Sequence, residues 1–339
     1  MNKKSKYAIN IAIILLVPIV TLTVLLNNNF KEIAHSLRNL NYFWLFLALI
    51  LILLWQFLVG MALTKLTKFF HKSYKYHQGF FNTIIAGFFH GITPSASGGQ
   101  FIQTYVFKKQ GVSSSESICV LWLDFIIYQV TMCMMTLVLI VVKFDYFKNT
   151  YSKWFGIILL GFIFDASIIF GLYALARFKK LHLWISNNGI GFLHKIHLIK
   201  DQEKTKANLE LKIERFQTES KKIVGNTRLI IITIIINALR LLVYYSIPFV
   251  VFVALGLKVD FDLYITSITI SSFISMLSNY IPLPGGSGGA ESLFVLMFGH
   301  LFLSAYVQIG MLIWRFLTYY VVMIIGAICF MYLKIKEDL

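Results

Sequence analysis

Long apolar segments separated by short polar ones dominate this sequence. Continuous apolar runs cover about residues 7–26, 42–63, 117–142, 154–175, 229–255 and 309–333. Each run is close to the roughly 20 residues that a helix needs to cross a bilayer. A β-barrel would instead show short segments of alternating hydrophobicity. The pattern therefore predicts an all-α polytopic membrane protein with about 6–8 transmembrane helices.

Two further apolar segments, residues 80–107 and 261–303, are each interrupted by the same motif. Pro94–Gly99 and Pro284–Gly289 both read P-x-x-S-G-G. Glycine and proline disfavour a continuous helix, and irregular backbone at membrane depth is tolerated only where protein surrounds it or it lines a polar cavity. Such paired interruptions are typical of a transporter's central site. We therefore expect two re-entrant segments in an inverted repeat; a chance match of two glycine-rich loops is the alternative.

The expected hinge positions are the prolines and glycines of the two motifs: Pro94, Gly98, Gly99, Pro284, Gly285, Gly286, Gly288 and Gly289.

Basic residues set the expected orientation. The chain has a net charge of +16, and in a membrane protein such an excess collects in cytoplasmic loops, so we expect no nucleic-acid partner. Lysines precede the first run, follow the second and follow the last. We therefore expect a multi-pass protein of the cell membrane, in a bacterial setting the cytoplasmic membrane, with both termini in the cytoplasm. The first broken segment then opens inward and the second outward.

One integral-membrane domain is expected over residues 1–339, with a first half at 7–176 and a second half at 229–333. The polar residues 177–228 between the halves are basic, and apolar residues such as Leu209, Ile213 and Phe216 recur there at helical spacing. We expect an amphipathic cytoplasmic helix that contacts anionic lipid headgroups. A solvated helical hairpin between the halves is the alternative.

Ionisable residues inside the predicted spans are the candidates for function, because a buried charge is costly unless it is paired. An arginine suits a phosphate group because its planar fork donates two hydrogen bonds to phosphate oxygens, and a helix start after a glycine break adds backbone donors. The candidate substrate-binding residues are Arg315, Glu291, Arg240, Ser287, Ser97 and Gln100, and Asp124 and Asp165 are structural or secondary candidates. In the alternative interpretation, these arginines and acids pair only to hold the helices together.

We find no sequence motif in the structural context that a hydrolase, a metalloprotease or a nucleotide-binding protein requires. There is no H-E-x-x-H or Walker A motif, and the three cysteines lie in apolar runs without metal-type spacing. The stretch Gly285–Gly289 matches the letters G-x-S-x-G, but it lies within an apolar segment and not after a strand. We therefore expect no catalytic residue, no metal site and no cofactor. An integral-membrane enzyme that uses Glu291 and Arg315 stays an alternative, although no pair of nucleophile and base is evident.

The motifs resemble those of a known family. Thr93-Pro94 with Gly98-Gly99-Gln100, the run Leu283–Glu291, and Arg315 in the last helix are similar to the transmembrane domain of lysylphosphatidylglycerol synthases. The resemblance covers roughly residues 8–333. It implies a lipid-flippase fold with two re-entrant segments. In full-length members, a C-terminal cytosolic domain transfers lysine from lysyl-tRNA to phosphatidylglycerol, and the membrane domain moves the product outward, which gives resistance to cationic antimicrobial peptides.

This chain stops a few residues past the last predicted helix, so we expect a stand-alone member without the aminoacyltransferase domain. The favoured hypothesis is a flippase for a phospholipid, such as phosphatidylglycerol or lysylphosphatidylglycerol, or for a lipid-linked phosphate headgroup. One alternative is a phosphatidylglycerol lysyltransferase, active alone or with a separate synthase subunit. Another is a non-transporting membrane scaffold, whose basic segment at 195–228 recruits partners.

Overall fold

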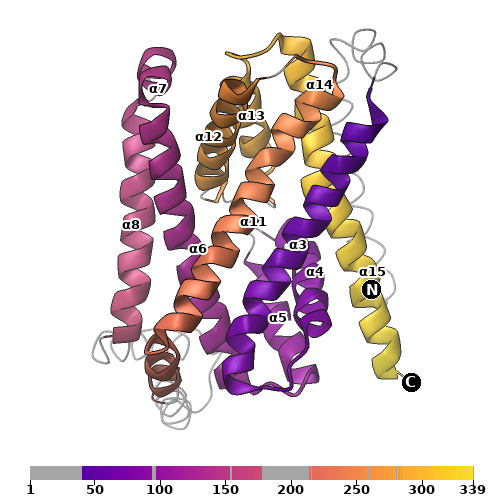
Figure 1. Cartoon of the computed structure of the whole chain (residues 1–339). Helices are drawn as coiled ribbons and strands as arrows, with labels where there is room; N and C mark the ends of the chain where they lie inside the picture. The colour runs from indigo at the N-terminus through magenta and orange to yellow at the C-terminus, as the bar shows by residue number, and fades with distance from the viewer. Residues whose placement is uncertain are drawn as a thin grey trace, which may run out of the picture.

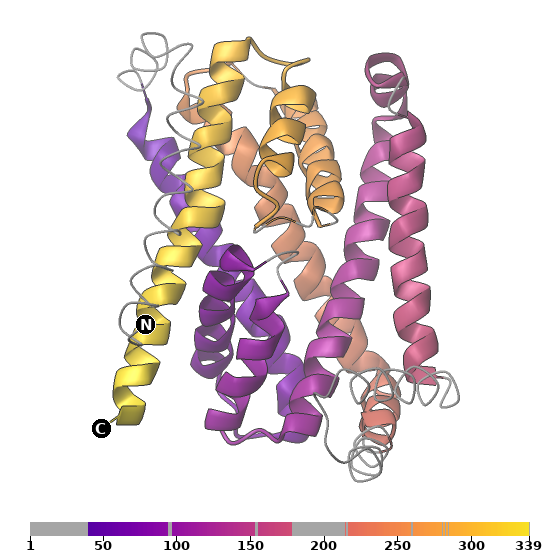
Figure 2. The ribbon, with the colours of Figure 1, turned by 180° about the vertical axis from the view of Figure 1, so that it is seen from behind.

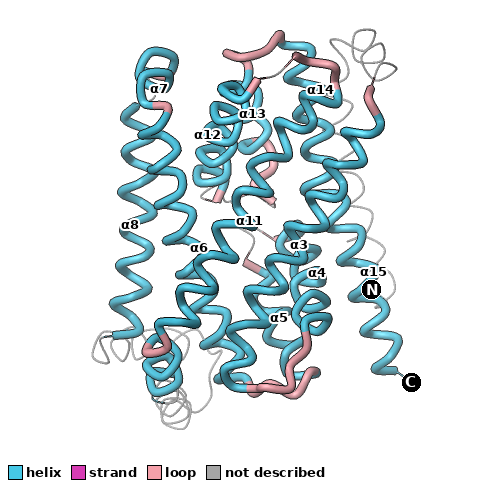
Figure 3. The backbone as a smooth tube through the Cα atoms, in the orientation of Figure 1, coloured by secondary structure: helices cyan, strands magenta, loops and turns pink. Residues whose placement is uncertain are grey.

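The computed structural model describes residues 40–93, 97–152, 155–177 and 214–338, apart from single positions at 215, 259, 280, 282 and 284. Within this part of the chain the regular structure is helical (Figure 3), which confirms the predicted all-α class. The predicted span at 7–26, most of the polar segment 177–228, and the motif residues Pro94 and Pro284 lie outside the described residues.

The first half contains four helices: α3 (Tyr42–Phe70), α4 (Tyr76–Ile92), α5 (Gly98–Lys109) and α6 (Ser114–Val142). α4 and α5 form a helical hairpin across the first glycine motif (Figure 1). α6 begins where the serine cluster predicts a helix start. The Ser113 hydroxyl accepts a hydrogen bond from the Glu116 amide, and the Glu116 carboxylate accepts one from the Ser113 amide. This reciprocal capping box satisfies two backbone donors at the helix start.

The second half repeats this order: α11 (Thr227–Ala254), α12 (Phe261–Ser278), α13 (Gly289–Phe298), and a final helix made of α14 (Ser304–Arg315), the π-helical turn η2 (Phe316–Val321) and α15 (Val322–Asp338). α12 and α13 form the second hairpin, across the second glycine motif. The final helix begins at Ser304, earlier than the predicted start near residue 309. Its π-helical turn follows Arg315 directly, and such turns in α-helices often mark functional sites.

The two halves run in opposite directions. In Figures 1 and 2, α3 descends, the α4–α5 hairpin occupies the lower half, and α6 ascends. α11 ascends, the α12–α13 hairpin occupies the upper half, and α14–α15 descends. The start of α3 and the end of α11 are joined by a hydrogen bond from the Asn41 amide to the Ala254 carbonyl, 2.8 Å long. The broken tips of the two hairpins therefore point toward each other at mid-height.

Two more helices, α7 (Phe144–Thr150) and α8 (Phe155–Arg177), follow α6. α8 packs along α6 at the side of the bundle, away from α15 (Figure 1). α7 joins the upper end of α6 to the second hairpin, because the buried Tyr151 hydroxyl just after it donates to the Met297 carbonyl of α13 at 2.6 Å.

Apolar packing is concentrated around each hairpin. In the upper cluster, Phe252 of α11 lies against Phe298 and Phe302, with ring centroids 5.1 and 4.3 Å apart. In the lower cluster, Phe107 of α5 packs with Leu63 of α3. Burial of these large side chains stabilises the folded chain by roughly 1.5–3 kcal/mol for each one in water, and by less against lipid. The hairpin tips lie between the two clusters.

Among the described residues, five helices are long and apolar enough to cross a membrane: Tyr42–Phe70, Ser114–Val142, Thr227–Ala254, Phe261–Ser278 and Ser304–Ile335. Many of their large apolar side chains face outward, including Phe46, Leu137 and Ile328. An outward apolar surface over several long helices is expected of a protein surrounded by lipid. The chain is thus a multi-pass α-helical membrane protein.

Candidate functional site

The tip of the first hairpin is closed by Thr93. Its hydroxyl donates to the Phe89 carbonyl at 2.7 Å and accepts from the Gly98 amide at 2.9 Å, so it links the end of α4 to the start of α5. The His90 ring packs directly on Gly99, where a Cβ atom would come within 2.1 Å of the ring. A larger residue at position 99 would therefore force the His90 ring to move.

The tip of the second hairpin depends on left-handed glycines. Gly285, Gly286 and Gly288 have φ angles of +59°, +64° and +82°, a region that costs residues with a Cβ atom free energy. The Gly286 amide donates to the Leu283 carbonyl at 2.9 Å, which tightens the turn before α13. The glycine motif thus builds a compact loop in the middle of the molecule.

Arg315 is held by this second loop. Its Nε donates to the Glu291 carboxylate at 2.6 Å, and its Nη2 donates to the Gly285 carbonyl at 2.6 Å. The Ser287 hydroxyl lies 3.5 Å from the same Nη2. Arg315 and Glu291 are each 7% exposed, so this is a buried ion pair that fastens the final helix to the second hairpin.

Tyr319, one turn after Arg315, connects the two hairpin tips. Its hydroxyl donates to the Gly91 carbonyl of the first hairpin at 2.8 Å. Its ring packs on Gly285 of the second hairpin, where a Cβ atom would lie 2.1 Å from the ring, and it stacks under the Arg315 guanidinium at 4.5 Å. A single tyrosine on the π-helical turn therefore contacts both glycine breaks.

Arg240 of α11 is buried in a different way. It is 5% exposed, and its guanidinium lies 4.3 Å above the Tyr128 ring of α6. Its Nη1 is 3.9 Å from Asp124 Oδ2, which is too long for a hydrogen bond. Within the part of the chain that the structure describes, neither Nε nor Nη1 of Arg240 has a hydrogen-bond partner. Arg240 is a buried cation with donors to spare.

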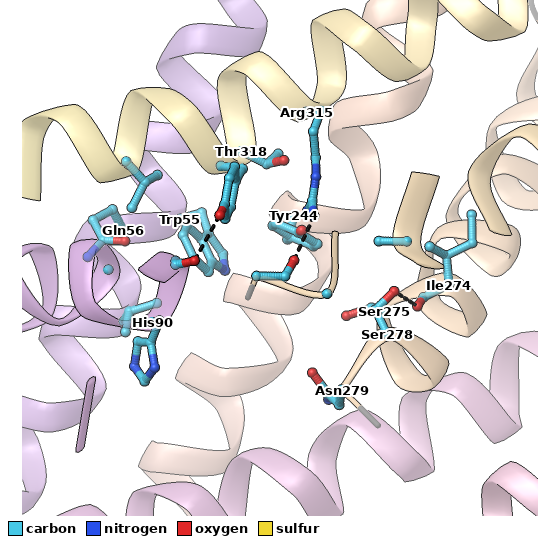
Figure 4. Close-up of a pocket in the computed structure, with 18 of the residues that line it drawn as sticks. Trp55, Gln56, His90, Tyr244, Ile274, Ser275, Ser278, Asn279, Arg315 and Thr318 are labelled. Carbon is cyan, nitrogen blue, oxygen red and sulfur yellow. Dashed lines mark hydrogen bonds between the residues drawn. The ribbon is translucent and has the colours of Figure 1, made fainter. Parts of the chain in front are cut away.

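A cavity of about 350 Å³ lies between the hairpin tips, and both arginines line it. Figure 4 shows how its wall is assembled from several helices, with Arg315 above, Tyr244 of α11 behind, Trp55 of α3 to one side, and Ser275, Ser278 and Asn279 at the end of α12. His90 and Gly91 at the end of α4 and the loop glycines Gly285 and Gly286 complete the wall at the two tips.

The structure separates the predicted site residues into groups. Arg240, Arg315, Gly285 and Gly286 line the cavity. Glu291 and Ser287 contact Arg315 but are not among the lining residues. The remaining glycines form the turns and helix starts, Gly98 and Gly99 at α5 and Gly288 and Gly289 at α13.

Ser97 and Gln100 lie apart from the cavity. Both residues are exposed, and neither is among those that line the wall. The reason is geometric: α5 begins at Gly98 and turns Gln100 toward the outside, while Gln103, one turn further, is buried and lines the cavity.

The two aspartates have separate surroundings. Asp124 of α6 faces Arg240. Asp165 of α8 is fully buried and accepts a hydrogen bond from the Gln129 amide of α6, while its Oδ2 has no partner among the described residues. Asp165 is not one of the residues that line the cavity.

Aromatic residues of the site were missed by the sequence interpretation, since aromatics are common throughout membrane helices. A usable signal was nevertheless present. In three of these helices a charged residue is followed four positions later by a tyrosine: Asp124 and Tyr128, Arg240 and Tyr244, Arg315 and Tyr319. Residues four apart lie on one helix face, and all three tyrosines line the cavity.

Comparison with known proteins places this geometry in context. The sequence model of the lysylphosphatidylglycerol synthase transmembrane region matches residues 7–326. A protein described as a UPF0104 membrane protein from Archaeoglobus fulgidus is 21% identical over 328 residues, which cover 95% of this chain and 97% of that protein. The match to the family extends through both hairpins and into the final helix, past Arg315 and Tyr319.

Proposed function

This chain belongs to the family of the lysylphosphatidylglycerol synthase transmembrane region, and from that premise we propose that it translocates a lipid with a phosphate-bearing headgroup between membrane leaflets. The observation that supports the proposal is Arg240, a buried cation with unpartnered donors on the wall of a cavity between two opposed hairpins. The family's name refers to the membrane region of a phospholipid synthase, which agrees with a lipid as the cargo.

Arg240 supplies the phosphate contact in this proposal. Its Nε and Nη1 lie on different edges of the planar guanidinium group, and each can donate a charge-assisted hydrogen bond to an oxygen of an anion. Burial of both donors without partners costs free energy, and an incoming anion would recover it. The Tyr128 ring below the guanidinium fixes its plane.

Arg315 has a second role, as the anchor of the second hairpin. Two of its donors already bind Glu291 and the Gly285 carbonyl. It adds positive charge to the wall, but most of its hydrogen-bonding capacity holds the protein together. The sequence made both arginines candidates for substrate binding; their contacts favour a binding role for Arg240 and a positioning role for Arg315.

The opposed hairpins supply the path. Each tip lies at mid-height and each hairpin opens toward its own end of the bundle (Figure 2). A headgroup between the tips would reach one side or the other when one hairpin moves away from the cavity, which is how inverted repeats achieve alternating access. The left-handed glycines and the broken helix ends are the positions that would absorb such a movement.

Leaflet-resolved transport tests this function. The purified chain is reconstituted in liposomes that contain acyl-labelled fluorescent phosphatidylglycerol, and dithionite bleaches only the label in the outer leaflet. Wild-type protein should expose inner-leaflet label well beyond the protein-free level. Arg240→Gln should slow this exposure by about tenfold or more, because a hydrogen bond to a charged group contributes about 1.5–3 kcal/mol.

Arg228→Gln is the matched control, since Arg228 is an exposed arginine at the start of the same helix. It should transport at the wild-type rate. Monodisperse elution of all three proteins would show that each is folded. The proposal would be refuted if liposomes with the wild-type protein bleached no more than liposomes without protein. Equal translocation rates for the wild type and Arg240→Gln would also refute it.

A further inference from the structure

We infer that the cavity selects an anionic headgroup rich in hydroxyl groups and rejects a headgroup that carries amino groups. This inference rests on the proposed function and narrows its substrate class. It is drawn from the charge, the polar groups and the aromatic rings of the cavity wall. It predicts that a phosphoglycerol or phosphoinositol headgroup is preferred over a lysylated one.

The charge of the wall is the first observation. Two arginines line the cavity, and within the described residues no aspartate or glutamate does. The two carboxylates nearest to these arginines face them and lie off the cavity wall: Glu291 at 2.6 Å from Arg315 and Asp124 at 3.9 Å from Arg240. A lysylated headgroup would bring two amino groups into this space. These amino groups would be dehydrated without gaining a carboxylate partner on the wall, and they would lie near the positive charges of Arg240 and Arg315, so their binding would cost free energy.

The polar groups of the wall are the second observation. Ser271, Ser275 and Ser278 lie on one face of α12 at the spacing of successive helical turns, and all three line the cavity with Asn279. The Ser271 and Ser278 hydroxyls donate to carbonyls one turn back, at 2.8 and 2.6 Å. Their oxygen lone pairs therefore stay available as acceptors. Neutral amides face the same space from two other helices, Gln56 of α3 and Gln103 of α5.

The neutral serine and amide side chains of the cavity wall suit the hydroxyl groups of a lipid headgroup, because a hydroxyl group both donates and accepts hydrogen bonds. A buried polar group discriminates strongly against a ligand that leaves it unpaired. The wall thus offers a phosphate contact at Arg240 and partners for several hydroxyls beside it.

The aromatic rings are the third observation. Trp55 and Tyr244 pack against each other with ring centroids 5.2 Å apart and a tilt of 42°, and both line the cavity (Figure 4). Their apolar faces complement the C–H surface of a glycerol or an inositol. Two other rings of the wall, those of Tyr128 and Tyr319, already carry guanidinium groups over their faces at 4.3 and 4.5 Å, so these two faces are occupied.

Competing headgroups in one assay test the inference. Liposomes contain the wild-type chain and one acyl-labelled fluorescent lipid: phosphatidylglycerol, phosphatidylinositol or lysylphosphatidylglycerol. Dithionite bleaching gives the translocation rate of each. At least one hydroxylated lipid should move about tenfold or more faster than the lysylated lipid, and Arg240→Gln should slow it.

The outcomes separate the two proposals. If lysylphosphatidylglycerol moves as fast as the hydroxylated lipids or faster, and Arg240→Gln slows it, the headgroup inference is wrong while the flippase proposal stands. If none of the three lipids moves beyond the protein-free rate, both fail.

A charge variant of the wall adds a second readout. Ser275→Asp places a carboxylate in the cavity, and Ser275→Asn is its uncharged control of the same size. The aspartate should reduce the preference for the hydroxylated lipid by about fivefold or more, and the asparagine should keep it. Equal preference ratios for two folded variants would show that the charge of the wall does not set the selection.

Discussion

Two buried arginines show how similar residues acquire different roles. Arg315 is bound by a carboxylate and a backbone carbonyl, both at 2.6 Å. Among the described residues, Arg240 faces a carboxylate 3.9 Å away and a tyrosine ring, and its Nε and Nη1 make no hydrogen bond. A buried donor without a hydrogen-bond partner costs free energy, so such donors are rare outside functional sites. The unpaired donors of Arg240 therefore favour a ligand-binding role for this residue.

The Arg315–Glu291 pair predicts a coupled effect on stability. Glu291→Gln alone leaves Arg315 buried without its counter-charge, which should cost about 3–5 kcal/mol and lower the apparent melting temperature in detergent. Arg315→Gln should do the same. The double variant removes both charges, so it should be less destabilised than the sum of the single variants. Additive losses in the three melting curves would contradict a direct pair.

Asp165 predicts the opposite behaviour. No cation pairs with this fully buried carboxylate among the described residues, and one of its oxygens has no partner. Asp165→Asn keeps an acceptor for Gln129 and removes the need to bury a charge, so the apparent melting temperature should be unchanged or higher. Asp165→Leu, which removes the acceptor, should lower it. A loss with asparagine as large as with leucine would show that the charge itself stabilises the fold.

At the scale of elements, Tyr319 joins two hairpins that are far apart in the sequence. Tyr319→Phe keeps the ring on Gly285 but removes the hydrogen bond to the Gly91 carbonyl. The loss of about 1 kcal/mol should raise amide hydrogen exchange near both tips by roughly fivefold. Exchange measured by mass spectrometry on peptides around Gly91 and Gly285 checks this.

Tyr320→Phe is the control for this measurement, because it removes a hydroxyl from the next residue without touching Gly91. Its peptides should exchange at the wild-type rate. Unchanged exchange in Tyr319→Phe would mean that the tyrosine does not hold the tips together.

The hairpins themselves follow from the sequence, whereas their contacts do not. The glycine motifs predicted both breaks, because glycine and proline disfavour a continuous helix. At the second break, Gly285 and Gly286 adopt left-handed angles that favour glycine. The final helix begins at Ser304, before the predicted start near residue 309, and continues through a π-helical turn that has no signature in the sequence. Which buried residue meets which hairpin depends on tertiary packing, so Tyr319 and Trp55 emerged only from the structure.

For the whole molecule, the inverted order of the two halves gives the cavity its position. An apolar cluster surrounds each hairpin, and the cavity with its two arginines lies between them, at the depth where lipid tails would lie outside. Alternating access requires that this space open to each side in turn. The central claim of the account is that the cavity is a passage and not a closed pocket.

Thiol labelling from each side of the membrane tests this claim most directly. Cys119, Cys133 and Cys329 are replaced by alanine, and Ser275→Cys places one thiol on the cavity wall. A charged, membrane-impermeant maleimide is then added to right-side-out and to inside-out vesicles. Ser167→Cys on the exposed face of α8 is the control, since a thiol in hydrocarbon should react from neither side. The account predicts that the cavity thiol reacts from both sides; reaction from one side only, or from neither, would contradict it.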